Sequence, residues 1–238
     1  MWIDNRKILG VIGGMGPLAT QLYYKLIIEK TDANCDQEHL NMIILNHATM
    51  PDRTKAILEG RSEELLNLLT KDAQMLEQNG AGVIAIPCNT SHVLMDKLQK
   101  NINIQIINMV EETVNYIVNT FSENDLRIGI LATDGTINTG LYQKALEKQG
   151  ICPLVPSTES QKLVMKLIYE GVKNGGEIDI SDFLMVQEEL FEKKCHGAIL
   201  ACTELSCLRE MYKLPPYYID AMVILAEKSI LACGGKIK

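Results

Sequence analysis

The chain has 238 residues, of which 47% are hydrophobic, 5% aromatic and 22% charged, and its formal net charge is −7. This composition predicts a soluble globular chain of one large or two modest domains, with an aliphatic core. The acidic balance and the lack of a basic cluster exclude nucleic acid and anionic membrane as expected partners. Residues 1–7 do not resemble a signal peptide and no apolar run is long enough to span a bilayer, so we expect a cytoplasmic location.

The seven cysteines form no recognisable disulfide or ligand pattern. Their number is odd, no C-x-x-C pair occurs, and no cysteine–histidine spacing is typical of zinc. We therefore expect no disulfide framework and no metal, with most cysteines buried as small apolar side chains. The seven are Cys35, Cys88, Cys152, Cys195, Cys202, Cys207 and Cys233.

The chain opens with an apolar run at residues 8–12, which predicts a strand, followed by a glycine-rich turn and a helix from Pro17. The turn formally matches a dinucleotide fingerprint. We discount that match because the second expected strand, residues 41–45, ends in Asn46 and His47 and not in an acidic residue. The glycines favour instead a carboxylate held at the helix N-terminus.

The loop after the second strand carries Arg53 beside a proline. One interpretation is an arginine on the solvated surface, and the other is a planar guanidinium that clamps a carboxylate. A helix is expected to follow, with leucines at positions 65, 66, 69 and 76, and to end at Asn79 and Gly80.

Two short apolar runs, at residues 83–86 and 197–201, end at Cys88 and Cys202. Such runs are typical of buried parallel strands, whose carboxyl ends are where open α/β sheets bind ligands. A helix is predicted after each cysteine, with Thr203 as the cap of the second and Asn89, Thr90 or Ser91 as the cap of the first. The helix dipole would then favour a thiolate at both positions.

The other expected strands and helices alternate along the chain. The strands are residues 102–107, 126–131, 152–156 and 217–220, and the helices are residues 110–118, 160–173, 181–194 and 221–232.

The two halves of the chain show weak self-similarity. Gly10 and Gly129, and likewise Tyr23 and Tyr142, lie 119 positions apart, as do four further identical pairs. This offset is close to half the chain length and predicts an internal duplication. We therefore predict an α/β fold of two pseudo-symmetric lobes, each a mostly parallel sheet flanked by helices, with the active site in the cleft between them. The expected division is 1–115 with Cys88, 116–215 with Cys202, and 216–238 as a last strand and helix that pack back on the N-terminal lobe.

Two similar cysteines, one in each half, suit the inversion of a carbon centre. One thiolate removes the α-proton from one face, and the other thiol returns a proton to the opposite face. A single nucleophilic cysteine would instead need an oriented histidine, and only His92, four residues after Cys88, is near either cysteine in sequence.

Four segments together resemble the aspartate/glutamate racemase family, in the family's order and over nearly the whole chain. They are residues 13–20 (GGMGPLAT), 51–54 (PDRT), 87–92 (PCNTSH) and 201–205 (ACTEL). The resemblance implies a racemase that needs no pyridoxal phosphate or other cofactor and acts on an acidic amino acid, aspartate or glutamate, with Cys88 and Cys202 as the catalytic thiols. It further implies that the substrate is bound by Met15, Gly16, Arg53, Asn89, Thr90, Lys173, Thr203 and Glu204.

Several alternatives stay open at this point. Relatives of this family include broad-specificity racemases, hydantoin racemases and maleate isomerases. A non-enzymatic alternative is a two-lobed protein that only binds a small molecule. The sequence does not separate aspartate from glutamate as the substrate. It also leaves the oligomeric state open, with a homodimer as one option. The family's histidine after the aspartate is replaced here, since Asp220 is followed by Ala221 and Met222.

Overall fold

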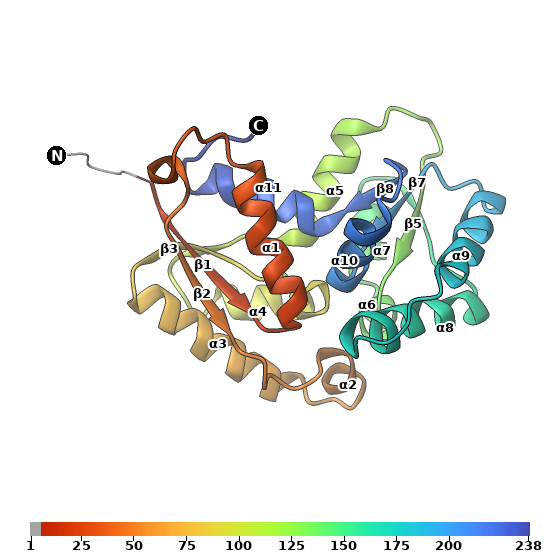
Figure 1. Cartoon of the computed structure of the whole chain (residues 1–238). Helices are drawn as coiled ribbons and strands as arrows, with labels where there is room; N and C mark the ends of the chain where they lie inside the picture. The colour runs from red at the N-terminus through yellow and green to blue at the C-terminus, as the bar shows by residue number, and fades with distance from the viewer. Residues whose placement is uncertain (1–5) are drawn as a thin grey trace. The chain divides into compact units, whose positions relative to one another are not determined.

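The computed structural model describes residues 6–238, which divide into two compact units. The first unit comprises the chain up to Met109 together with residues 222–238, and the second unit is Val110–Ala221. Each unit contains one four-stranded parallel sheet with helices on its faces (Figure 1). The predicted fold class, α/β with two parallel sheets flanked by helices, is confirmed.

The sheet of the first unit has the order β2-β1-β3-β4. Its strands are β1 (Ile8–Gly13), β2 (Met42–Asn46), β3 (Ala81–Ala85) and β4 (Gln105–Ile106), all paired in parallel. The strand predicted at residues 102–107 is therefore only two residues long. Helices of this unit are α1 (Pro17–Lys30), α2 (Arg53–Leu58), α3 (Ser62–Gln78), α4 (Met95–Gln99) and α11 (Ala221–Ala232).

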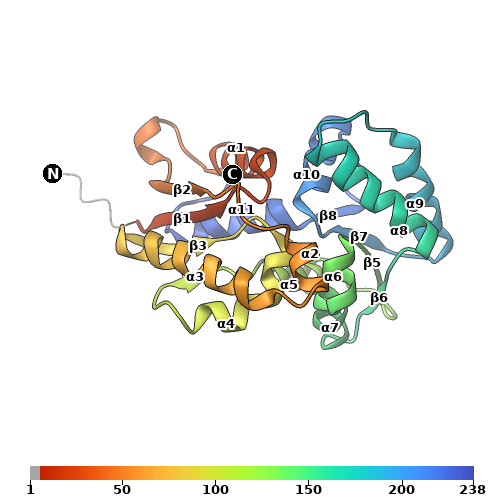
Figure 2. The ribbon, with the colours of Figure 1, turned by 90° about the horizontal axis from the view of Figure 1, so that it is seen from below.

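Helices α3 and α4 cover one face of the first sheet, and α1 lies on the other (Figure 2). The first core follows from the alternation of β1. Ile12 packs with the α3 leucines, and Gly10 faces Leu76 on the same side. Gly13 faces α1, where a Cβ would stand 2.4 Å from Cγ2 of Thr20, so only glycine fits there.

The second unit repeats the strand order as β6-β5-β7-β8, as expected of a duplication. Its strands are β5 (Arg127–Leu131), β6 (Cys152–Leu154), β7 (Gly197–Leu200) and β8 (Tyr218–Asp220), again parallel. Its helices are α5 (Met109–Thr120), α6 (Asp134–Thr139), α7 (Leu141–Glu147), α8 (Thr158–Lys166), α9 (Ile180–Glu192) and α10 (Thr203–Tyr212).

Two elements of the second unit differ from the sequence predictions. Strand β8 belongs to the sheet of the second unit, where its backbone pairs with β7, and the helix that follows it, α11, groups with the first unit. The helix expected at residues 160–173 changes at Leu167 into a π-helical segment, η3 (Leu167–Lys173). Such wide turns are frequent at functional sites, and η3 ends on Lys173.

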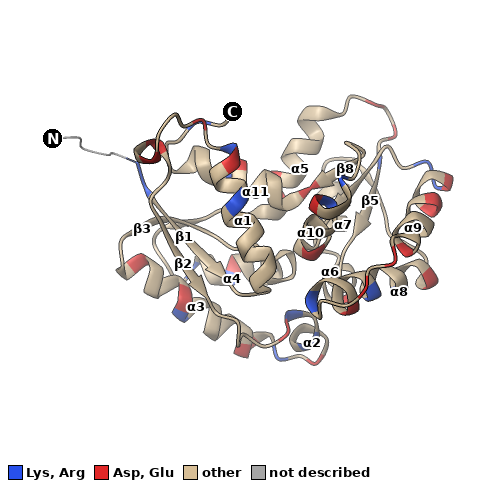
Figure 3. Ribbon diagram, in the orientation of Figure 1, with Lys and Arg blue, Asp and Glu red and all other residues tan. Residues whose placement is uncertain are grey.

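Charged side chains are carried mainly by the outer helices, such as α3 and α9 (Figure 3). Among residues 6–238 only five charged side chains are buried: Arg53, Asp72, Asp182, Glu204 and Asp220. Burial of a charge is costly unless it is paired, so each of these five side chains is expected to have a polar or charged partner. None of the helices in this part of the chain is long and apolar enough to cross a bilayer.

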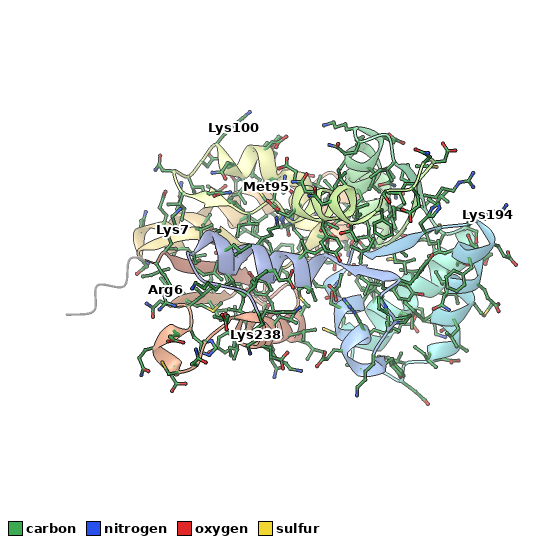
Figure 4. All side chains as sticks on the ribbon, turned by 90° about the horizontal axis from the view of Figure 1, so that it is seen from above. Arg6, Lys7, Met95, Lys100, Lys194 and Lys238 are labelled. Atoms are coloured by element: carbon green, nitrogen blue, oxygen red, sulfur yellow. The ribbon has the colours of Figure 1, made fainter. Side chains whose placement is uncertain are left out.

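The C-terminal tail is tied to the first unit by backbone hydrogen bonds. The Lys7 N–H donates to the Cys233 carbonyl at 3.0 Å, and the Lys238 N–H donates to the Lys30 carbonyl at 3.0 Å (Figure 4 labels Lys7 and Lys238). The tail and α11 therefore complete the unit that the N-terminal strand begins.

Candidate active site

Cys88 lies three residues beyond β3, at the carboxyl edge of the first sheet. Strand β1 is flanked by β2 and β3, so the loops after β1 and β3 part toward opposite faces of the sheet. Ligands bind at such a switch point in open α/β sheets. The Cys88 side chain is only 6% exposed, which places a buried thiol at this point.

The segment after Cys88 is a 3₁₀ helix, η2 (Asn89–Leu94), in place of the predicted α-helix. Cys88 itself is the capping residue, with extended backbone, and no side chain caps the helix. His92 Nδ1 donates to the Cys88 carbonyl at 2.9 Å. Burial lowers the pKa of His92, against hydrogen bonds with the backbone of Cys88 and Ile107. His92 therefore holds the backbone of the cysteine as a neutral imidazole, and its Nδ1 is not directed to the sulfur.

Arg53 is 7% exposed, which overturns the interpretation as a solvated surface arginine. Its guanidinium donates to the carbonyls of Pro51 at 2.9 Å and Met50 at 3.3 Å, and also to that of Met15 at 3.0 Å. The Ser91 hydroxyl approaches Met15 Sδ at 3.5 Å. The first unit thus brings the glycine-rich loop, Arg53 and the Cys88 segment together.

The glycine-rich loop is held by its own helix. The Gly14 N–H donates to Thr20 Oγ1 at 2.8 Å, and that hydroxyl donates to the Gly16 carbonyl at 3.0 Å. The Gly14 N–H is therefore not the open anion donor that the sequence suggested. Gly14 has φ +86° and its Cβ position is 2.5 Å from the His47 backbone, so this loop requires glycine for close approach.

One polar pair in the first unit was missed by the sequence analysis. His47 Nδ1 lies 2.8 Å from Asp72 Oδ2, which joins the end of β2 to α3. Asp72 is buried and His47 is partly exposed. The two residues are 25 positions apart and no local pattern links them, so only the fold could reveal this contact.

Cys202 occupies the matching place in the second unit, two residues beyond β7 and 6% exposed. Its sheet has the same switch point between β5 and β7. The Cys202 thiol donates to Glu204 Oε2 at 2.9 Å, and the Thr203 hydroxyl donates to the same oxygen at 3.3 Å. Cys202 caps α10 with extended backbone, so the predicted cap, Thr203, is instead the first helical residue.

The electrostatics of Cys202 are opposite to the prediction from the helix dipole. Burial raises the pKa of the Cys202 thiol well above its ordinary value, and the charge and hydrogen bond of Glu204 raise it further. The charge of Lys173 opposes these effects. Lys173 is the last residue of η3, and its Nζ lies 4.2 Å from the centre of the Tyr169 ring.

The expected site residues therefore fall into two groups, one in each unit. The first group is Met15, Gly16, Arg53, Cys88, Asn89 and Thr90, and the second is Lys173, Cys202, Thr203 and Glu204. All seven cysteines are free thiols. Within the described residues no cluster of three or more potential metal ligands occurs.

Comparison with known proteins identifies the family of this chain. The family model described as Asp/Glu/Hydantoin racemase matches residues 12–228. A broad-specificity amino-acid racemase, RacX of Bacillus subtilis strain 168, is 26% identical over 230 residues, which cover 94% of this chain and 96% of RacX.

Solved structures give the same result. Picrophilus torridus aspartate racemase has a TM-score of 0.77 and 29% identity, covering 98% of this chain and 96% of its own. An aspartate racemase homologue from Pyrococcus horikoshii OT3 has a TM-score of 0.74 and 25% identity, covering 96% and 99%. Because the family model spans nearly the full length, the chain belongs to the Asp/Glu/Hydantoin racemase family.

Proposed function

We propose that this protein racemises an acidic amino acid, aspartate or glutamate, without pyridoxal phosphate, and that Cys88 and Cys202 are its two acid–base groups. The observation that carries the proposal is the matched placement of two buried thiols. Each follows the third strand of its sheet at the switch point and caps the helix behind it.

In this mechanism one sulfur acts as base and the other as acid. A thiolate takes the α-proton from one face of the substrate, and the electron pair of the broken C–H bond remains on the α-carbon. The opposite thiol then gives its proton to the other face and becomes the thiolate. The reverse reaction exchanges the two roles, so the chemistry needs two groups of the same kind.

The charged residues of the two groups suit a dicarboxylate with one ammonium. The buried Arg53 guanidinium would bind the side-chain carboxylate through two parallel hydrogen bonds, with Lys173 as a second cation. Among residues 6–238 no donor reaches the buried Glu204 Oε1, and the substrate ammonium would supply one. Met15, Gly16, Asn89, Thr90 and Thr203 would line the substrate, as the family resemblance implies.

A wider substrate range is the second candidate. It is favoured by the similarity to RacX, a broad-specificity amino-acid racemase that this chain matches over 96% of its length. A hydantoin racemase is less well supported, because Arg53 and Lys173 suit free carboxylates, which a hydantoin ring lacks. A maleate isomerase is less well supported, because maleate has no ammonium to pair with Glu204 Oε1. Family membership argues against a protein that only binds small molecules.

The test is to incubate the purified protein, without added cofactor, with L-aspartate, L-glutamate and L-alanine in separate reactions. Loss of circular dichroism and uptake of deuterium at the α-carbon from D₂O report racemisation. We expect both signals with an acidic substrate, and equal rates with alanine would favour the broad-specificity alternative. A carbonyl scavenger that abolished the activity would contradict the thiol mechanism.

A further inference from the structure

Glu204 is bound to the reacting sulfur of Cys202 in a way that the substrate-binding role does not explain. It is 4% exposed, and its Oε2 accepts both the Cys202 thiol at 2.9 Å and the Thr203 hydroxyl at 3.3 Å. A carboxylate that accepts a hydrogen bond from S–H stabilises the protonated thiol, because a thiolate beside it would be a buried pair of like charges.

The first half of the chain has no counterpart to this arrangement in sequence. Two residues after Cys88 stands Thr90, a neutral side chain, where Glu204 stands two residues after Cys202. The two cysteines have the same backbone conformation and the same low exposure. The carboxylate bound to the sulfur is therefore a feature that distinguishes Cys202 from Cys88.

We propose that Glu204 is a positioning residue that keeps Cys202 in the thiol form, so that Cys202 is the proton donor of the resting enzyme and Cys88 is the base. This inference rests on the proposed function. The Cys88 thiolate takes the α-proton and forms S–H, and Cys202 gives its proton to the other face of the carbanion. The resulting Cys202 thiolate stands beside Glu204. The resting state returns when Cys202 takes up a proton and the Cys88 thiol releases one, through the substrate in the reverse reaction or through water.

Two charged groups act on the Cys202 thiol, Glu204 from its own helix and Lys173 from η3. Lys173 favours the thiolate and Glu204 disfavours it, so the balance between them sets the pH at which the thiolate forms. Burial adds to the effect of Glu204. Removal of the Glu204 charge should therefore release the thiolate at lower pH.

The experiment measures alkylation of Cys202 by iodoacetamide as a function of pH, in the substrate-free protein, with fragment mass spectrometry to resolve it from Cys207. Glu204→Gln keeps the size of the side chain and removes its charge. We expect its alkylation midpoint to fall by about one pH unit, so that labelling at pH 7.5 is about tenfold faster. Glu210→Gln, an exposed charge change on the same helix, is the control and should match wild type.

Equal or slower labelling of Glu204→Gln, relative to Glu210→Gln, would overturn the inference. Should Glu204→Gln lose its folded circular dichroism spectrum, Glu204→Asp serves instead, because it withdraws the carboxylate from the sulfur. Its midpoint should then fall by less than that of a neutral side chain, and an unchanged midpoint would refute the role. The assay uses no substrate: a midpoint shift in a protein without racemase activity would retain the Cys202–Glu204 link and reject the proposed function.

Discussion

The two units share a plan and differ at the sulfur. Both have the strand order 2-1-3-4, and both place a buried cysteine at the same switch point. In the first unit the neighbouring side chains bind backbone atoms: His92 donates to the Cys88 carbonyl, and Arg53 donates to the Met15 carbonyl in the glycine-rich loop. In the second unit the contact is to the sulfur itself, from Glu204. A duplicated fold thus supplies two equivalent positions, and nearby side chains make them chemically different.

The similarity extends to single buried side chains. Tyr23 in α1 shares a hydrogen bond of 2.6 Å with Ser229 in α11, and Tyr142 in α7 bonds to Thr113 in α5. Helices α5 and α11 each follow the fourth strand of a sheet, and each groups with the other unit. The same kind of hydroxyl partnership, made by two tyrosines 119 positions apart, supports duplication more strongly than the sequence identities alone.

The largest expected effect comes from replacing the two cysteines, and it tests whether Cys88 and Cys202 have equivalent roles. Cys88→Ala and Cys202→Ala should each lower racemisation by about a thousandfold or more, because each removes one acid–base group. Each variant should still exchange the α-proton of one enantiomer in D₂O, and the two variants should prefer opposite enantiomers. Chiral chromatography with mass spectrometry measures both quantities.

The exposed Cys35 provides the control, and Cys35→Ala should retain full activity. Near wild-type interconversion by Cys88→Ala would exclude the two-thiol scheme. Exchange of the same enantiomer by both variants would show that the two sulfurs do not serve opposite faces.

The next effect concerns Arg53, which has no arginine counterpart in the second group of site residues. Arg53→Ala should lower kcat/KM for aspartate and glutamate about 30- to several-thousand-fold, since losing a desolvated charge partner costs ~2–5 kcal/mol. Arg53→Lys should also be impaired, because an ammonium cannot form the paired geometry. Kinetics on aspartate, glutamate and alanine measure the selectivity of the loss.

Arg53 also donates to three backbone carbonyls, so the same variant tests its structural role. Leaving such carbonyls without their donor should lower the free energy of unfolding by about 1–3 kcal/mol in urea titrations. Arg61→Ala serves as the control, because it removes a partly exposed arginine at the start of α3 that pairs with Glu59 and Glu64. An equal kinetic loss on all three substrates would assign Arg53 to loop structure alone.

The sequence predicted the sheets and the place of both cysteines because apolar runs and turn residues are local signals. It mispredicted the state of Cys202, although Glu204 is only two residues away. The helix dipole argument assumed an accessible sulfur, whereas burial and a carboxylate outweigh the dipole here. The burial of Arg53 and the contact of His47 with Asp72 depend on residues distant in sequence, and no local pattern contains them.

A smaller effect compares the paired glycines of the two central strands. A Cβ on Gly10 would stand 2.9 Å from the Cβ of Ala81, which is fixed to its strand. A Cβ on Gly129 would meet the terminal methyls of Leu190 at 3.1 Å, which are able to move, and the strand-fixed Cβ of Ala198 at 3.2 Å, which is farther than Ala81 is from Gly10. Gly10→Ala should therefore lower the free energy of unfolding by about 1–3 kcal/mol and Gly129→Ala by less. Urea titration of both variants decides, and the opposite order would show that Leu190 is as firmly held as Ala81.

The smallest effect at neutral pH concerns the paired tyrosines. Burial raises the pKa of both Tyr23 and Tyr142 far above the ordinary value of about 10, while their hydroxyl partners oppose the shift. Their contribution to stability is therefore fully present below about pH 10 and is lost at higher pH, where the unfolded chain ionises first. Tyr23→Phe and Tyr142→Phe should each cost about 1 kcal/mol at pH 7 and remove about 1.4 kcal/mol per pH unit from the alkaline slope. The exposed Tyr24→Phe is the control, and urea titrations between pH 8 and about 11 give the slopes. If only one of the two variants changed the slope, the buried tyrosines of the two units would not be equivalent.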